Sequence, residues 1–236
     1  MAMAIGNGNV IVDDAVGNPA GDVEPFIRSG LLNGDKRMPL SVLQQVSYES
    51  NCSEAAFMAH DMVLSMQAMG LGGLLYFAGL NRWSILGAFE GDGIQGFGFR
   101  FQRDERWTLP NPVGLDGYFE GLCPPYHADM RAAVAAFVER EFGAGGTYDP
   151  AAAGPWRDAA AVRASVARYD DAFVECLGTV AQYVHDTYGK FPGAFETIVL
   201  PGFVQAVHLD TESYDTHYRE GAYLDTHAEH MRRWHG

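Results

Sequence analysis

Apolar residues recur at steps of three and four over a long stretch in the second half of the chain. The pattern consists of Val162, Val166, Tyr169, Phe173, Leu177, Val180 and Val184, and it ends at Gly189 and Pro192. Such spacing places these side chains along one face of an α-helix, and Pro155 suits a first helical turn. The sequence therefore predicts one helix of about 30 residues, about 45 Å long. Because this exceeds what a small domain needs internally, we expect part of it to pack against a second subunit.

A second helix is predicted before the middle of the chain. Asn51 and Glu54 have the spacing of a capping box, and four methionines follow at helical spacing, namely Met58, Met62, Met66 and Met69. Gly70 provides the expected stop. Because Phe57 and Leu64 make another face apolar too, we expect this helix to be deeply buried.

The remaining pattern predicts a small mixed sheet packed by these long helices, which is an α+β fold. Strand-like stretches lie at Leu74–Ala78, Ile85–Phe89, Phe97–Phe101 and Thr197–His208. Shorter helices are predicted at Met130–Phe142, Glu212–Tyr218 and Tyr223–Trp234. Turn-forming residues are frequent in residues 1–38, for which we expect an extended entry arm. Residues 208–236 form a histidine-rich C-terminal segment. We expect residues 1–236 to form a single domain.

Charge and cysteine usage narrow the class of protein. Thirty acidic residues against sixteen basic ones leave a formal net charge of −14, which would repel nucleic acid and anionic membrane surfaces. No apolar stretch is long enough to span a bilayer, and no secretory leader is recognisable at the N-terminus. The three cysteines are far apart and odd in number. This cysteine usage favours a reducing, cytoplasmic environment. With nucleic acid and membranes disfavoured, we expect a small-molecule substrate.

Familiar catalytic motifs are few. Gly91, Gly93 and Gly96 match the dinucleotide-binding fingerprint, but strand-like residues follow where that motif requires a helix. We therefore predict a turn between strands here. The sequence has no P-loop and no GxSxG motif, which disfavours a nucleoside triphosphatase or an ordinary serine hydrolase.

The helix from Glu54 and the turn after it carry a resemblance to a known family. Phe57-Met-Ala-His-Asp-Met-Val-Leu64, followed by Gln67-Ala-Met-Gly-Leu-Gly-Gly73, resembles the nitroreductase-like FMN-dependent flavoproteins. In that family a core helix ends in a Gly-Leu-Gly turn, and the chain then enters a sheet whose backbone approaches FMN. The match lies within residues 54–101, and the arginine-rich N-terminal motif that usually binds the flavin phosphate is missing.

The resemblance implies a function and a set of site residues. A nitroreductase-like chain would be a homodimer built on long helices. It would transfer electrons through FMN to a small organic acceptor. The residues carried across by the motif are Gly70, Gly72 and Gly73. The motif assigns no catalytic side chain.

The C-terminal histidines suggest different chemistry. Five of the eight histidines lie within residues 208–236, among several carboxylates. Neutral imidazoles and carboxylates bind zinc or non-haem iron, and a spacing of three places His227 and His230 on one helical face. The predicted metal ligands are His208, His217, His227 and His230, with Glu229 available to orient a ring.

Three functions therefore follow from the sequence. The first is a nitroreductase-like flavin-dependent oxidoreductase. The second is a metal-dependent enzyme that uses the histidine and carboxylate cluster. The third is a structural or interaction subunit without a cofactor, in which the tyrosines and Trp234 cover the core while the histidines bond surface carboxylates.

Overall fold

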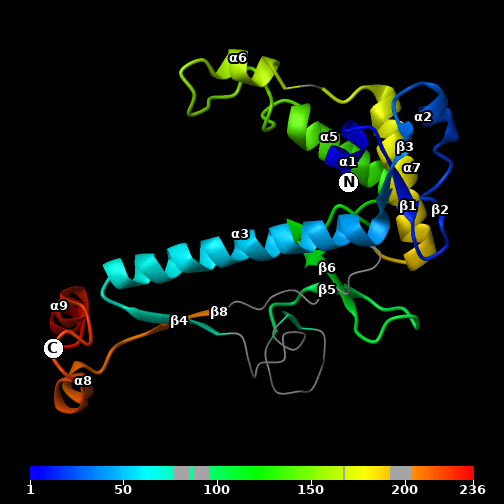
Figure 1. Ribbon diagram of the computed structural model, residues 1–236. Helices are drawn as coiled ribbons and strands as arrows, with labels where there is room; N and C mark the ends of the chain where they lie inside the picture. The colour runs from blue at the N-terminus through cyan, green and yellow to red at the C-terminus, as the bar shows by residue number, and fades with distance from the viewer. Residues whose placement is uncertain (77–85, 88–95, 167, 192–202) are drawn as a thin grey trace. The chain divides into compact units, whose positions relative to one another are not determined.

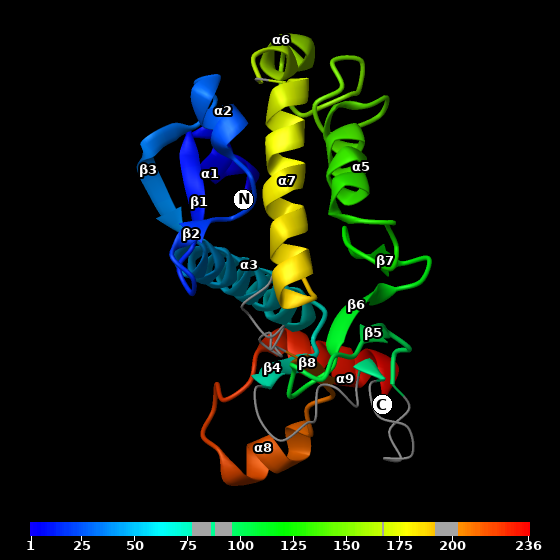
Figure 2. The ribbon, with the colours of Figure 1, turned by 90° about the vertical axis from the view of Figure 1, so that its right-hand side faces the viewer.

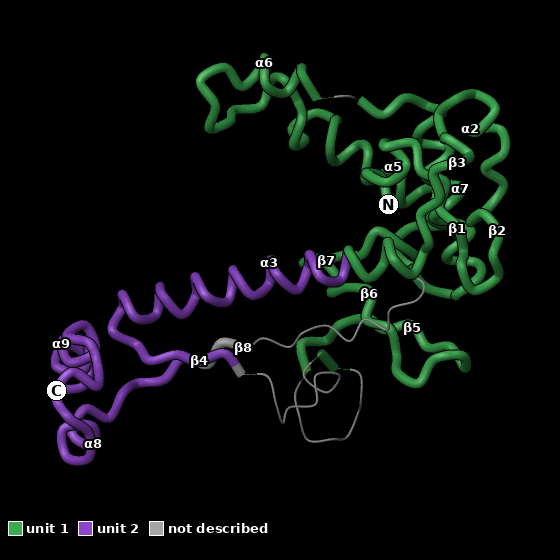
Figure 3. Tube along the Cα trace, viewed as in Figure 1, with its two compact units in different colours: residues 1–46, 83–197 green, residues 47–82, 198–236 purple. Residues whose placement is uncertain are grey.

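The chain folds into two compact units in the computed structural model, which describes residues 1–76, 86–87, 96–166, 168–191 and 203–236 (Figure 1). Unit 1 comprises Met1–Val46 and Trp83–Thr197, and unit 2 comprises Ser47–Arg82 and Ile198–Gly236 (Figure 3). Most of the predicted strand at Ile85–Phe89 and most of the fingerprint at Gly91–Gly96 lie outside the described residues.

The elements of unit 1 alternate between helices and short strands. In chain order they are α1 (Ala2–Gly6), β1 (Asn9–Asp13), β2 (Asn18–Pro19), α2 (Glu24–Arg28), β3 (Asn33–Pro39), the start of α3 (Leu40–Ala68), β5 (Arg100–Gln102), β6 (Asn111–Leu115), β7 (Phe119–Glu120), α5 (Met130–Phe142), α6 (Ala159–Ala164) and α7 (Asp171–Tyr188).

Residues 1–38, expected as an extended arm, contain much of the first sheet. Its strand order is β2-β1-β3, with β2 antiparallel and β3 parallel to β1. Val10, Ile11 and Val12 of β1 are almost fully buried. The turn formers that suggest an arm instead connect these elements, because short strands need tight turns between them.

The hydrophobic core of the described residues lies within unit 1. The β1 side chains pack with the inner faces of α5 and α7, which run beside each other (Figure 2). Phe173, Cys176, Leu177, Val180 and Val184 are buried. The predicted apolar face of this helix is therefore confirmed, and it packs within unit 1.

The prediction of one continuous helix from Pro155 to Tyr188 is wrong. α6 ends at Ala164, and α7 begins only at Asp171. The Asp170 side chain accepts a hydrogen bond from the Phe173 amide, 2.8 Å away, and so caps the new helix. Capping at Asp170 thus starts a new helix although the apolar spacing continues through Val166 and Tyr169.

The second sheet of unit 1 is small and antiparallel. Its order is β5-β6-β7, with Arg100 paired to Gly114 and Leu115 paired to Phe119. Of the predicted strand Phe97–Phe101, only the last two residues belong to β5. The α5 helix forms where its apolar pattern predicts, and the Asp129 side chain caps it through the Ala132 amide.

Unit 2 contains most of α3 followed by a two-stranded sheet and two short helices. These elements are β4 (Gly72–Tyr76), β8 (Phe203–Val207), α8 (Thr211–His217) and α9 (Asp225–Trp234). β4 and β8 are antiparallel, and Gly72 pairs with Val207. This pairing brings the start of β4 beside the end of β8.

The expectation of deep burial for the methionine-rich helix is wrong. Within α3, Ala59 and Met66 are buried, but Phe57 is 71%, Met58 is 68% and Met62 is 54% exposed. Ala59 and Met66 are seven residues apart and share one side of the helix. An apolar pattern all around a helix therefore does not require that every side be covered within the chain.

The observed structure is a mixed α+β fold with small sheets, as the pattern predicts at that level. None of the helices in the described parts of the chain combines the length and the apolar character that a bilayer-spanning helix needs.

Candidate metal site

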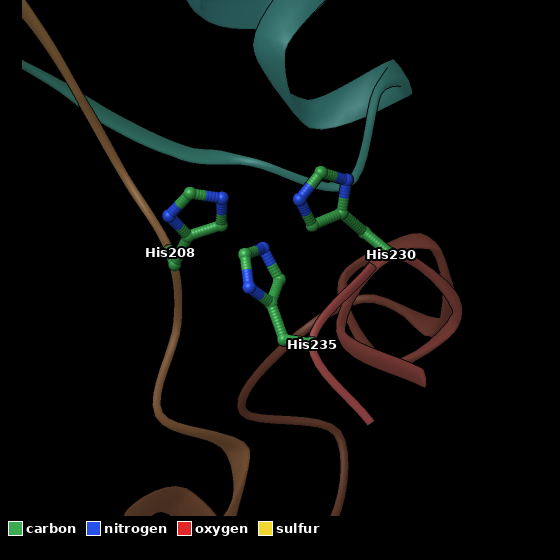
Figure 4. Close-up of side chains that lie close together, drawn as sticks. All are labelled: His208, His230 and His235. Carbon is green, nitrogen blue, oxygen red and sulfur yellow. The ribbon is translucent and has the colours of Figure 1, made fainter. Parts of the chain in front are cut away.

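Three histidines of unit 2 bring their imidazole rings together. One ring nitrogen from each of His208, His230 and His235 lies within 4.8 Å of the other two. Figure 4 shows the three rings turned toward one another. His208 directly follows β8, His230 lies in α9, and His235 directly follows α9.

The fold of unit 2 explains why these three segments meet. The β4–β8 pairing sets the end of β8, and hence His208, near the turn that follows α3. At that turn α9 is joined to the end of α3, because the Thr226 hydroxyl donates a 3.0 Å hydrogen bond to the Gln67 carbonyl oxygen. The amide of His235 donates to the Met231 carbonyl, which keeps His235 against the last turn of α9.

The rings are in direct contact. The ring centroids of His208 and His235 are 4.2 Å apart, and those of His208 and His230 are 5.2 Å apart. Desolvation of the His235 ring lowers its pKa, and the charges of His208 and His230 lower it further. This environment favours the neutral imidazole, which is the form that binds a metal ion.

One nitrogen of the cluster lacks a partner. Nε2 of His230 is buried, and it neither donates nor accepts a hydrogen bond in the described structure. Buried polar atoms are almost always bonded, so this nitrogen is available to a ligand, as are the buried Nε2 atoms of His185 and His227, which also have no partner.

The structure brings together only part of the predicted ligand set. His208 and His230 belong to the cluster, whereas the described residues place His217 and His227 outside it. His217 is exposed at the end of α8. Nδ1 of His227 accepts a 3.2 Å hydrogen bond from the Leu224 amide at the start of α9. The described structure therefore does not group His227 with His230 as the spacing predicts, and Nδ1 of His227 instead turns back to the start of its own helix.

His235 is the member of the cluster that the sequence pattern does not reveal. It follows His230 by five residues, a spacing that does not place two side chains on one helical face. Because α9 ends at Trp234, His235 has left the helix and returns toward His230. Its only sequence signal is the position of a histidine directly after a short helix.

The carboxylates near the cluster have other partners. Glu229, which was expected to orient a ring, forms ion pairs with Arg232 at 2.5 Å and with Arg233 at 3.7 Å. Among the described residues, the group that can share an ion contains imidazoles only.

The glycines carried over from the flavoprotein resemblance lie in the same unit, where the chain packs closely on itself. Gly70 has a φ of +78°, and a Cβ added there would lie 2.2 Å from the Thr226 carbonyl oxygen and 2.3 Å from the His230 Cβ. A Cβ added to Gly72 would lie 2.8 Å from Leu209. Gly73 pairs with Ala206 across the β4–β8 sheet. Residues of α9 and Leu209 thus pack closely beside Gly70 and Gly72.

Comparison of the chain with protein-family models, with curated proteins and with solved structures found no match in any of the three. The function is therefore inferred from the side chains of the site itself.

Proposed function

We propose that His208, His230 and His235 hold a first-row transition metal ion, zinc by preference, and that the chain is a metal-dependent enzyme using this ion to activate water. The observation that carries the proposal is the approach of three imidazole nitrogens to within 4.8 Å of one another. In a tetrahedral zinc site with Zn–N bonds of about 2.0–2.1 Å, ligand nitrogens are about 3.3 Å apart. Small side-chain rotations of partly exposed rings would close the remaining distance.

The ligand set favours zinc over iron. Non-haem iron sites commonly combine two histidines with one carboxylate, whereas zinc is well served by three imidazoles. The group contains no carboxylate among the described residues. Iron, which the sequence also allows, is therefore a less suitable ion for this site than zinc.

Three protein ligands would leave a coordination position for water. Zinc sites of this composition lower the pKa of bound water to about 7, which supplies hydroxide as a nucleophile near neutral pH. His208 and His235 are exposed, so a substrate in solution would have access to the ion. This combination supports a hydrolytic site in preference to a closed structural one.

Metal titration tests the binding step. The chain, stripped with a chelator and titrated with Zn²⁺ in a calorimeter, should bind one ion per chain. Replacing His235 with alanine should weaken binding by about 100-fold, as expected when one of three ligands is lost. His217→Ala is the matched control, because His217 is an exposed histidine of the same unit and should leave the affinity unchanged. Equal affinities for the two variants would reject the site.

A second measurement tests the catalytic step. Hydrolysis of 4-nitrophenyl acetate should depend on added Zn²⁺ and should be lost with the chelator and in His235→Ala. Tight zinc binding without any zinc-dependent hydrolysis would reject the enzymatic function and leave only metal binding.

The nitroreductase-like oxidoreductase remains a second proposal. One observation favours it: α3 ends in a left-handed Gly70, and the chain then enters β4, which is the order of elements that the resemblance implies. An absorption spectrum separates the two functions. Flavin bands after purification or after reconstitution with FMN would favour this second proposal over the metal enzyme.

A further inference from the structure

A cleft in unit 2 lies between the C-terminal end of α3 and one face of α9. It has a volume of about 660 Å³. Met69, Leu71 and Trp234 form much of its apolar lining. Met69 and Trp234 are large apolar side chains that remain exposed there. The cleft is therefore large enough for a small organic molecule, which these side chains would contact.

The cleft and the histidine cluster share a residue. His230 lines the cleft and also contributes one of the three clustered nitrogens. Thr226, Glu229, His230 and Arg233 all line the cleft at helical spacing, so one face of α9 forms its polar side. A ligand seated against this face lies beside an imidazole that would hold the metal.

The net charge around the cleft would become positive when an ion binds. Its charged lining consists of Asp225 and Glu229 against Arg232 and Arg233, which balance when the histidines are neutral. A bound Zn²⁺ would add two positive charges at His230. The cleft would then attract an anion, although the whole chain carries a net charge of −14.

We propose that this cleft binds a small organic carboxylate with an apolar or aromatic body, the carboxylate approaching the metal and the two arginines while the body packs on Trp234 and Met69. The proposal rests on the metal site proposed above. The Glu229 carboxylate already forms ion pairs with Arg232 and Arg233. The two arginines are thus placed to engage a carboxylate group, and guanidinium groups suit such planar anions.

Exposure limits what the arginines contribute by themselves. The Arg232 and Arg233 side chains are 73% and 67% exposed, and exposed ion pairs are weak and screened by salt. The ion is therefore needed for useful affinity, and binding of the carboxylate should depend on the metal.

The experiment uses the full chain loaded with Co²⁺, whose visible absorption reports on its ligands. Benzoate is the probe, acetate is the probe without the apolar body, and benzyl alcohol is the neutral analogue. Benzoate should change the Co²⁺ spectrum at a lower concentration than acetate does, because it binds more tightly. Benzyl alcohol should leave the spectrum unchanged. The double variant Arg232→Ala/Arg233→Ala should weaken benzoate binding about tenfold. Trp234→Ala should remove most of the preference for benzoate over acetate.

The control variant is Arg28→Ala. Arg28 is a surface arginine of unit 1 that pairs with Glu24 at the same four-residue spacing as Arg233 with Glu229, so its loss should leave benzoate binding unchanged.

The outcomes separate the two proposals. A Co²⁺ spectrum that forms normally but ignores benzoate overturns the carboxylate cleft and leaves the metal site in place. A benzoate response of equal strength in the wild type and the double arginine variant also overturns the cleft, because the probe then coordinates the ion from open solvent. Failure to bind Co²⁺ at all rejects the metal site, and the cleft proposal falls with it.

Discussion

The Tyr188 hydroxyl donates a 2.8 Å hydrogen bond to Oδ1 of Asp13, which joins the last residue of α7 to the last residue of β1. Asp13 is only 1% exposed. Its other oxygen accepts a 2.9 Å hydrogen bond from the Tyr183 hydroxyl. A buried carboxylate is costly unless it is bonded, so the two tyrosines, together with the Ala15 amide that donates to Oδ1 at 3.1 Å, allow Asp13 to lie in the core of unit 1.

Removing one of these bonds should destabilise unit 1. Tyr188→Phe leaves Asp13 buried with one donor fewer, and we expect the free energy of unfolding to fall by about 1.5–3 kcal/mol, the usual range for a hydrogen bond to a charged group. Urea unfolding followed by circular dichroism measures the change. Tyr118→Phe, at an exposed tyrosine of the same unit, is the control and should have little effect. A Tyr188→Phe variant as stable as the wild type would show that water replaces the lost donor.

The contact between Tyr188 and Asp13 also predicts that the free energy of unfolding falls at alkaline pH. Burial, together with the hydrogen bond to Asp13 and its negative charge, raises the pKa of Tyr188 to about 12. A raised pKa means that the folded state favours the neutral phenol. The stabilisation is therefore complete below the ordinary tyrosine pKa of about 10, and it is lost as the pH rises toward 12.

Unfolding curves measured at pH 9 and pH 11 test whether this stabilisation is lost as the pH rises. The stability difference between the wild type and Tyr188→Phe should shrink at the higher pH, because only the wild type carries this ionisable group. A difference that grows with pH would contradict the assignment.

His227 and His235 should respond in opposite ways to substitution. His227→Ala removes the bond to the Leu224 amide and should cost about 1 kcal/mol, as other N-terminal helix caps do, while zinc affinity is retained. His227→Gln is the informative partner, since a glutamine at this position can also reach back to the first amides of the helix and should restore the lost stability. Loss of zinc binding in His227→Gln would instead make His227 a ligand.

The exposed side of α3 bears on the predicted homodimer. Met58 and Met62 are four residues apart and share one exposed side of α3, and exposed Met69 directly follows the helix. Methionine side chains adapt well to interfaces, so this exposed apolar side is a surface that a second copy could cover. If this side is covered by a second copy, Met62→Lys should convert a dimer to a monomer in sedimentation experiments. Val16→Lys, at an exposed apolar residue of unit 1, should not. A monomeric wild type would reject the homodimer.

Local pattern predicts several elements of this fold well. α5 forms at Met130–Phe142, and α8 and α9 form within one or two residues of the predicted ranges. The buried face of α7 also follows its apolar spacing. The break before α7 is missed because Val166 and Tyr169 continue that spacing, while the competing signal comes from one capping residue, Asp170.

The site is harder to predict because it depends on contacts that are distant in sequence. His208 and His230 can be selected from composition alone, since they belong to a histidine-rich segment. His235 joins them only because α9 ends before it and because β8 pairs with β4, which lies far earlier in the chain. Helical periodicity instead selects His227, whose role in capping becomes visible only with the backbone in place.

X-ray absorption spectroscopy of the zinc-loaded chain tests the central claim most directly, because it reports the atoms bound to the ion. We predict three imidazole nitrogens and one oxygen at about 2.0–2.1 Å, with one imidazole fewer in His235→Ala. A sulfur shell at about 2.3 Å, or a first shell without imidazole scattering, would contradict the assignment of His208, His230 and His235 as the ligands.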